Sequence, residues 1–311
     1  MFKSKLSTFL LALLMVISLF LSLSPVGNAA ETKHVKFSVS MWSGDWLPTY
    51  VPKILLEDNL GYTTEVLSLS IPAGMAAIAA GEVEVTTIVW MPNNQPLVDK
   101  YLGQTIEDLG TIYPECLQAI FIPKWVSQQY GIKSISDLNN PQFAKMFDID
   151  NDGKGDWLGC DPGWLCAKLN DQCIALYGLD KLYVQMMGEE HFLLAAMAGR
   201  MKKHEPVLIS QFYPHVMFID YPKDESMVVL DDPKHFWFTA HVQKFGNKKW
   251  IAGNPKAAEL IRQVKMTAED VMWMMKETRA KGDKPATLEA IAREWITKNK
   301  ASVDSWLAKI K

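Results

Sequence analysis

Four tryptophans stand in segments rich in turn-forming residues, where an indole ring can face a ligand instead of a core. The sequence contains 11 Trp in 311 residues, and Trp42, Trp46, Trp90 and Trp164 lie near Gly, Pro or Asp. A Trp face attracts cations, and cages of aromatic rings bind quaternary ammonium groups, which have no N–H to donate. Core packing is the commoner role of any single Trp. For Trp90 and Trp164, each near a turn proline, we favour a cation-binding role.

A run of acidic residues forms a second group with a recognisable spacing. Carboxylates at positions 1, 3, 5 and 9 and a glycine at position 6 match the start of an EF-hand-type calcium loop; the carboxylates are Asp148, Asp150, Asp152 and Asp156. Position 12, where a bidentate Glu normally stands, is Gly159. Two alternatives remain: a structural Ca²⁺ completed from elsewhere in the fold, or a solvated Asp/Gly turn.

No assembled catalytic set is visible in the sequence. It contains no HExxH, no GxSxG and no phosphate-binding glycine loop. The triplet at 189–191, Glu-Glu-His, lies in a helix-like stretch, and we expect a solvated charged face there. We therefore expect no cofactor for chemistry. The alternative is an exported enzyme acting on a small methylated amine, with Asp45 and Glu115 as acid and base.

Composition narrows the class of protein. The formal net charge is -3 and hydrophobic residues make up 49%. These values exclude a disordered chain and a basic nucleic-acid binder. The length suggests two domains, each large enough to bury its own core.

The first 30 residues carry the pattern of a secretory signal peptide. Lys3 and Lys5 precede an apolar stretch at 9–23, which is followed by a helix-breaking Pro25 and small residues up to Ala30. The stretch is shorter than the roughly 20 residues that a bilayer crossing needs. We predict cleavage near residue 29 or 30 and a soluble, exported, periplasmic protein.

Export bears on the four cysteines, because thiols usually pair in an oxidising compartment. Cys160 and Cys166 bracket a short turn-forming segment, and we expect a disulfide between them. Cys116 and Cys173 are far apart in sequence. They form either a second bridge or two buried free thiols, and the sequence leaves both open.

These residues are distributed over alternating strand and helix patterns. Such alternation favours a parallel sheet with crossover helices, and ligands then sit beyond the carboxyl ends of the strands. We expect strands at 35–39, 63–69, 85–90, 117–122 and 207–212, helices at 47–60 and 72–80, and a mostly helical segment from residue 257. The segments 42–46 and 90–94 directly follow two of these strands, so both should lie on the ligand-facing edge.

The acidic run and the cysteine loop together resemble the glycine betaine/proline betaine binding proteins of ABC importers. The run at 147–156 is followed at 159–166 by Gly-Cys-Asp-Pro-Gly-Trp-Leu-Cys. Supporting segments are Ala79 to Glu82, Val89 to Pro92, Gln211 to Pro214, and Trp295 to Trp306. The resemblance implies an α/β, two-lobe periplasmic binding protein fold (type II) with the ligand in the interlobe cleft. We assign residues 31–116 and 238–311 to lobe I and 117–237 to lobe II.

The same resemblance implies a function and a set of partners. The protein would capture a quaternary or methylated ammonium compound and deliver it to an ABC transporter permease, as a monomer and without a nucleic-acid partner. Its aromatic cage would comprise Trp90 and Trp164, with Phe212, beside Tyr213, at the position of a third aromatic ring. Backbone N–H groups around Trp164 and Leu165 would bind the anionic end of a zwitterion.

Two differences from the family pattern affect which ligand we expect. The segment 42–46, with Trp42, Asp45 and Trp46, resembles the ligand-facing loop of related choline and trimethylamine N-oxide binders. Glu115 lies near the expected first crossing between lobes, where a carboxylate would repel the carboxylate of glycine betaine. We therefore rank trimethylamine N-oxide first, choline second and glycine betaine third. The alternative is that Glu115 caps a turn at the surface.

Overall fold

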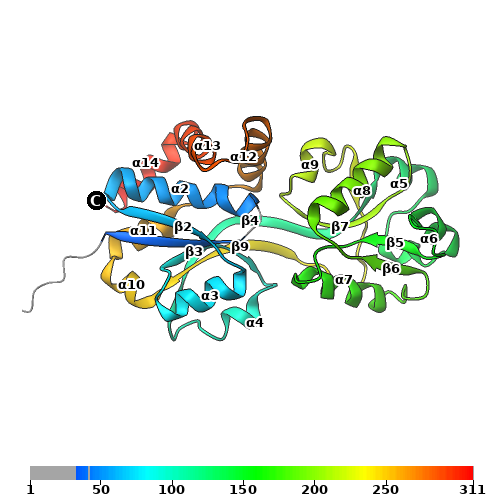
Figure 1. Ribbon diagram of the computed structural model, residues 1–311, viewed down its shortest axis with the longest axis horizontal. Helices are drawn as coiled ribbons and strands as arrows, with labels where there is room; N and C mark the ends of the chain where they lie inside the picture. The colour runs from blue at the N-terminus through cyan, green and yellow to red at the C-terminus, as the bar shows by residue number, and fades with distance from the viewer. Residues whose placement is uncertain (1–32, 41–42, 311) are drawn as a thin grey trace, which may run out of the picture. The chain divides into compact units, whose positions relative to one another are not determined.

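The protein is described by a computed structural model, which covers residues 33–40 and 43–310. The predicted signal peptide and Trp42 lie outside these residues. From Val35 onward the chain forms one compact unit. Its sheet has nine strands, in the order β2-β1-β3-β9-β4-β7-β5-β6, with β8 paired to β4 (Figure 1). Across the part of the chain described, no helix is both long and apolar enough to cross a membrane.

The first strands and helices lie close to the positions predicted from the sequence. Strands β1 (His34–Val39) and β3 (Val85–Met91) pair in parallel, β2 is Thr63–Ser68, and α3 is Ile71–Ala80. Helix α3 ends at Gly81, whose φ of 80° is a left-handed conformation that favours glycine.

Helix α2 differs from the prediction. It runs from Ser43 to Leu60 and not from residue 47, so residues 43–46 belong to its first turn and not to a loop. Asp45 stands in that first turn, where a carboxyl group interacts favourably with the positive end of the helix. The helix also contains Pro48 and Pro52.

The prediction of a parallel sheet is only partly right, because the sheet is mixed. Strand β4 (Ile106–Pro123) is three times as long as predicted, and it pairs antiparallel with β9 (Thr239–Asn247), β7 (Leu208–Tyr213) and β8 (Met227–Val229). Parallel pairing joins β1 to β3, and β5 (Gly155–Leu158) to β6 (Tyr183–Met186) and β7. The first half of β4 lacks a regular alternation of apolar and polar residues, because it contains polar residues, Gly110 and shifts in register. The sequence pattern therefore did not predict this half of the strand. In Figure 1 the two long strands β4 and β9 run side by side.

Helices cover the sheet along its length. The remaining helices are α4 (Gln95–Val98), α5 (Lys124–Tyr130), the 3₁₀ helix η2 (Ile135–Leu138), α6 (Pro141–Phe147), α7 (Leu165–Leu176), α8 (Glu190–Lys202), α9 (Met217–Asp220), α10 (Lys248–Gly253), α11 (Pro255–Gln263), α12 (Ala268–Lys281), α13 (Pro285–Lys298) and α14 (Lys300–Ala308). The helical segment predicted from residue 257 therefore corresponds to α11 through α14, beginning two residues earlier.

Buried side chains divide along β4. Cys116 belongs to a core shared with α2 and α11–α14, whereas Ile120 and Ile122 belong to a second core with α5–α7. The separation falls near residue 117, where we placed the lobe boundary. The exact lobe boundaries remain a prediction.

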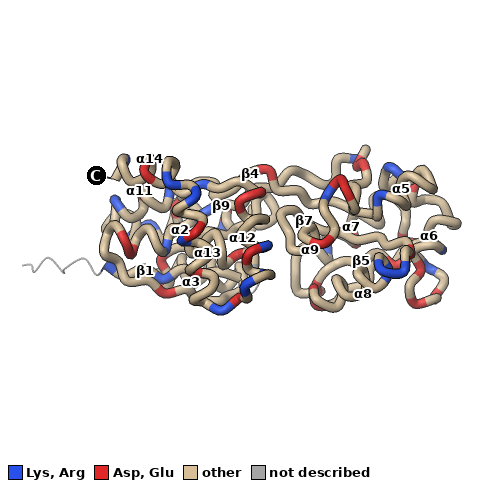
Figure 2. Tube along the Cα trace, turned by 90° about the horizontal axis from the view of Figure 1, so that it is seen from above, with Lys and Arg blue, Asp and Glu red and all other residues tan. Residues whose placement is uncertain are grey.

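Charged residues of both signs are interspersed along the chain (Figure 2). Several form surface ion pairs, such as Lys281 with Glu277 and Glu294 on α12 and α13. Exposed pairs of this kind contribute little stability.

Among the described residues, one lysine side chain is fully buried. Lys244 of β9 has no exposed surface, and its Nζ donates hydrogen bonds to the carbonyls of Ile261 (2.8 Å), Arg262 (3.1 Å) and Val264 (2.6 Å). Three N–H donors thus meet three carbonyls at the carboxyl end of α11, where helix carbonyls lack intrahelical partners and a cation is favoured. Lys244 therefore ties α11 to the sheet.

We expect Lys244→Met to lower the free energy of unfolding by about 2–3 kcal/mol, because it leaves buried carbonyls without a charged donor. Denaturant unfolding measures this loss. Lys300→Met is the control, since Lys300 is exposed and pairs only with Asp304. Equal losses in the two variants would show that the buried contacts of Lys244 carry no stability.

Candidate ligand-binding site

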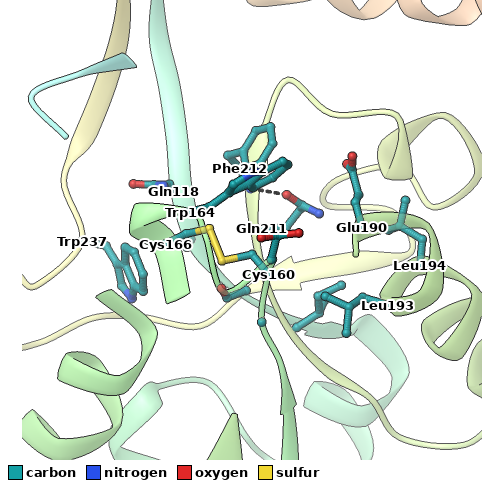
Figure 3. A pocket seen from close by; sticks show the side chains of 15 residues that line it. Gln118, Cys160, Trp164, Cys166, Glu190, Leu193, Leu194, Gln211, Phe212 and Trp237 are labelled. Carbon is teal, nitrogen blue, oxygen red and sulfur yellow. Dashed lines mark hydrogen bonds between the residues drawn. A yellow bond between two sulfur atoms is a disulfide. The ribbon is translucent and has the colours of Figure 1, made fainter. Parts of the chain in front are cut away.

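A hollow opens between the amino end of α7, the end of β7 and the first turn of α8. Its empty space, including the part open to solvent, is about 490 Å³. Trp164, Phe212 and Trp237 supply aromatic surface, and the Cys160–Cys166 disulfide forms part of the wall (Figure 3).

The predicted disulfide is present. The Cys160 and Cys166 sulfurs are 2.07 Å apart. Inside the bridged segment, Asp161 accepts hydrogen bonds from Gly163 N–H (2.7 Å, at Oδ1) and from Trp164 N–H (2.9 Å, at its carbonyl). The result is a closed turn that ends at Trp164, directly before the first residue of α7.

This turn keeps large apolar side chains at the surface. Trp164 is 39% exposed and Leu165 is 43% exposed. Trp164 is the N-cap residue of α7, and no side chain caps the helix there. The first N–H groups of a helix favour an anion, so an aromatic face and an anion-attracting helix end lie next to each other.

The two remaining cysteines are free and buried. Cys116 lies in the core with α2, and Cys173 in the core with α5–α7. Burial raises the pKa of each thiol to about 12. Of the two alternatives that the sequence left open, the structure has the pair of inert thiols.

Trp90 and Phe212 meet although they are far apart in sequence. Their ring centroids are 5.2 Å apart with an interplanar angle of 67°, and Trp90 also meets Tyr113 edge-on at 6.4 Å. Phe212 lines the hollow, whereas Trp90 touches its wall through Phe212. Tyr213 packs against Phe218 at 5.5 Å and does not line the hollow.

Asp45 is a buried acid in the first turn of α2. It is 2% exposed; its Oδ2 accepts a hydrogen bond from the Ser40 hydroxyl, and its Oδ1 has no hydrogen-bond partner among the described residues. Burial raises the pKa of Asp45 to about 8; the hydrogen bonds from Ser40 oppose this shift, and the charge of Glu190 adds to it. Nearby, Trp46 donates from Nε1 to the Ser40 carbonyl (3.1 Å).

Glu115 is exposed and lies in an irregular part of β4. Its φ is 60°, and the register with β9 shifts between Tyr113 and Cys116. It is not among the residues that line the hollow.

Two carboxylates line the hollow, Asp161 and Glu190, and sequence reasoning placed Glu190 on a solvated face. Its neighbours Glu189 and His191 are indeed 67% exposed. Glu190, in contrast, is 28% exposed and contacts the fully buried His215. The sequence does show a carboxylate at the start of a predicted helix. It does not show that His215, 25 residues further along the chain, contacts this carboxylate.

The acidic loop brings together three of its four predicted carboxylates. Ligand oxygens of Asp148, Asp150 and Asp156 lie within 4.8 Å of one another, whereas Asp152 is not in this group. Asp156 is 1% exposed, and the Oδ1 of Asp148 is buried without a hydrogen-bond partner.

Gly159 shows why the twelfth position cannot hold a glutamate. A Cβ built there would lie 2.2 Å from the Gln185 Oε1 atom. Gln185 is held by Asn170 (3.0 Å) and by the Ala167 carbonyl (2.9 Å), so it cannot easily move away. Close packing at the wall of the hollow has excluded a side chain.

Residues 33–298 match the family model described as the substrate binding domain of ABC-type glycine betaine transport system. The glycine betaine/proline betaine-binding periplasmic protein of Salmonella typhimurium is 25% identical over 271 residues, which cover 80% of this chain and 82% of that protein.

Two solved structures are similar in fold. One is lactococcal OpuAC in a closed, liganded conformation complexed with glycine betaine, with a TM-score of 0.73 and 20% identity, covering 88% of this chain and 99% of that one. The other is an ABC-transporter choline binding protein in complex with choline, with a TM-score of 0.72 and 19% identity, covering 89% and 92%. The two-lobe periplasmic binding protein fold implied by the sequence resemblance is confirmed.

Because the pKa of Asp45 is raised, the free energy of unfolding should depend on pH. The native state holds this proton from about pH 4 to about pH 8, whereas the unfolded state releases it near pH 4. Stability from this group therefore falls as pH rises through that window. We expect Asp45→Asn to match the parent near pH 4 and to be more stable by several kcal/mol above pH 8, since it buries no charge.

Denaturant unfolding at several pH values measures this difference. The control is Asp304→Asn, whose carboxylate is 57% exposed and should show no such trend. A stability difference independent of pH would mean that Asp45 is ionised in the native protein.

Proposed function

The chain belongs to the family of substrate-binding domains of ABC-type glycine betaine transport systems, and we propose that it captures a methylated ammonium compound in an aromatic cage. The cage comprises Trp164 and Phe212 at the hollow, with Trp90 against Phe212. The observation that carries this proposal is the exposed Trp164 face beside Phe212 in a hollow whose described lining includes two acids and neither Lys nor Arg.

The physical basis is the attraction between a cation and aromatic faces. A trimethylated head offers no hydrogen-bond donor, so it is held by ring quadrupoles and by contact with apolar surface. Acidic groups nearby add a favourable field for a positive head. A charged or polar tail could meet the uncapped amino end of α7 next to Trp164.

The family is one of binding domains and not of enzymes, so the chain is a binding protein. The alternative of an exported enzyme with Asp45 and Glu115 as acid and base finds no support. Asp45 is buried behind Ser40, while Glu115 is exposed on β4. Neither lines the hollow.

We also propose where the protein works and what it delivers its ligand to. The protein is exported to the periplasm by its signal peptide, works there as a monomer and delivers its ligand to an ABC transporter permease. The supporting facts are the amino-terminal sequence pattern and the periplasmic location named for the Salmonella relative.

For the ligand we propose trimethylamine N-oxide first, choline second and glycine betaine third. Acidic groups support this order, because a ligand without its own carboxylate avoids like-charge repulsion in a partly dry site. The order was inferred from Glu115, which does not line the hollow. Asp161 and Glu190 do line it, and they support the place of a ligand without a carboxylate ahead of glycine betaine.

We also propose a structural Ca²⁺ at the acidic loop, held by Asp148, Asp150 and Asp156, with Asp152 close by in the loop. The support is the convergence of three carboxylates and the unpartnered, buried Oδ1 of Asp148. Hard carboxylate oxygens suit Ca²⁺. The ion would neutralise like charges and would take no part in ligand chemistry.

We expect Trp164→Ala and Trp90→Ala each to weaken ligand binding more than tenfold. A desolvated cation over a Trp face contributes about 2 kcal/mol. Tryptophan fluorescence or calorimetric titration with trimethylamine N-oxide, choline and glycine betaine measures the loss. Trp273→Ala is the matched control, because Trp273 lies on α12 and pairs with Lys298. Parent-like binding by both cage variants would remove the cage assignment.

For calcium, we expect a chelator to lower the melting temperature of the native protein, since an ion bound only to the folded state stabilises it by mass action. Asp148→Asn and Asp156→Asn should abolish the difference between chelated and calcium-loaded protein, with little change in ligand affinity. Identical melting curves with chelator and with added Ca²⁺ would refute the site.

A further inference from the structure

A fully buried histidine contacts one of the two carboxylates that line the hollow. His215 has no exposed side-chain surface, and its Nε2 contacts the Oε1 of Glu190, which is 28% exposed and lines the hollow. The two residues come from different elements: Glu190 is the first residue of α8, and His215 follows β7. Because this pair lies at the proposed ligand site, the inference rests on the proposed binding function.

The hydrogen bond at Nδ1 indicates which ring nitrogen of His215 carries the proton. Its Nδ1 accepts a hydrogen bond from the Met217 N–H at 3.2 Å, so Nδ1 carries a lone pair and the ring proton must be on Nε2. Nε2 then donates to Glu190. A neutral imidazole fixes the carboxylate in place without cancelling its charge, and only one carboxylate oxygen is used.

The same histidine also contacts the cage. The ring of His215 meets Phe212 edge-on, with centroids 4.9 Å apart. Figure 3 shows Glu190 on one side of the hollow and Trp237 on the other, with Phe212 above the disulfide. His215 therefore couples the position of the carboxylate to that of an aromatic wall.

Glu190 is the acid best placed to act on a ligand. The other acid in the lining, Asp161, already accepts Gly163 N–H at 2.7 Å within the disulfide-bridged turn. Among the described residues that line the hollow there is no Lys or Arg to neutralise either acid. The field of Glu190 reaches beyond the hollow, because its charge contributes to the raised pKa of Asp45 on α2.

We infer that Glu190, oriented by His215, is a specificity-determining residue that makes the site favour a trimethylated ammonium cation over a trimethylated ammonium ligand that carries its own carboxylate. Both kinds of ligand present the same head to the aromatic faces, so the cage alone cannot separate them. A fixed carboxylate can, since it attracts the net cation and repels a second carboxylate. His215 is a positioning residue in this arrangement.

The test is the ratio of the dissociation constants of glycine betaine and choline, measured calorimetrically on the mature protein. Glu190→Gln keeps the shape and removes the charge, and we expect it to move this ratio about tenfold toward glycine betaine. Glu189→Gln is the matched control, because Glu189 is the adjacent acid and is 67% exposed. That control should leave the ratio unchanged.

The role of His215 is tested in both backgrounds. His215→Gln should shift the ratio of dissociation constants in the parent and should not shift it further in the Glu190→Gln variant. If His215 were only structural, its loss would weaken the binding of both ligands equally in both proteins. An unchanged ratio in a folded Glu190→Gln variant overturns the inference, as does a shift produced by Glu115→Gln instead. If the parent binds neither ligand, nor trimethylamine N-oxide, the proposed function itself fails.

Discussion

The antiparallel ladder β3-β9-β4-β7 is the constraint on which the site depends. Trp90 and Tyr113 both stand opposite Val242 of β9, and Phe212 of β7 stands opposite Gln118 of β4. Backbone pairing therefore brings these three residues together, and the Trp90 ring contacts both the Tyr113 ring and the Phe212 ring, although Trp90 and Phe212 are more than a hundred residues apart in sequence. Since side chains alternate strictly along a strand, a shift of one residue in this register would turn the rings away from each other.

The second requirement is to keep a large aromatic ring exposed. Exposing Trp164 forgoes the stabilisation that burial of its side chain would contribute. The bridge between Cys160 and Cys166 and the hydrogen bonds to Asp161 hold the turn that presents this ring. Gly159 lets the chain approach Gln185 closely on the other side. The disulfide and these hydrogen bonds thus hold in place an exposed aromatic ring that hydrophobic packing does not enclose.

The buried acid Asp45 lies in unfavourable surroundings. Asp45 is buried with one oxygen unpartnered, and Glu190 adds to the unfavourable field at that carboxyl. Buried Lys244 is treated differently, because three carbonyls satisfy it. Burial shifts the pKa of both groups toward the neutral form, to about 8 for Asp45 and to about 7 for Lys244. The difference is that Lys244 makes three hydrogen bonds to carbonyl groups.

Sequence alone determined what depends on residue type and short spacing. The disulfide-bridged turn between Cys160 and Cys166, the first strands and helices and the convergence of carboxylates in the acidic loop could be predicted from it, because each rests on local chemistry or on a motif of a few residues. The ligand-binding role of Trp90, Trp164 and Phe212 stays a prediction. Tertiary structure decided what depends on long-range pairing. The antiparallel course of β4, the helical start at Ser43, the two free thiols and the meeting of Glu190 with His215 all depend on which strands pair and where helices dock. No local pattern encodes those contacts, since the partners are distant in the chain and only the folded sheet brings them together.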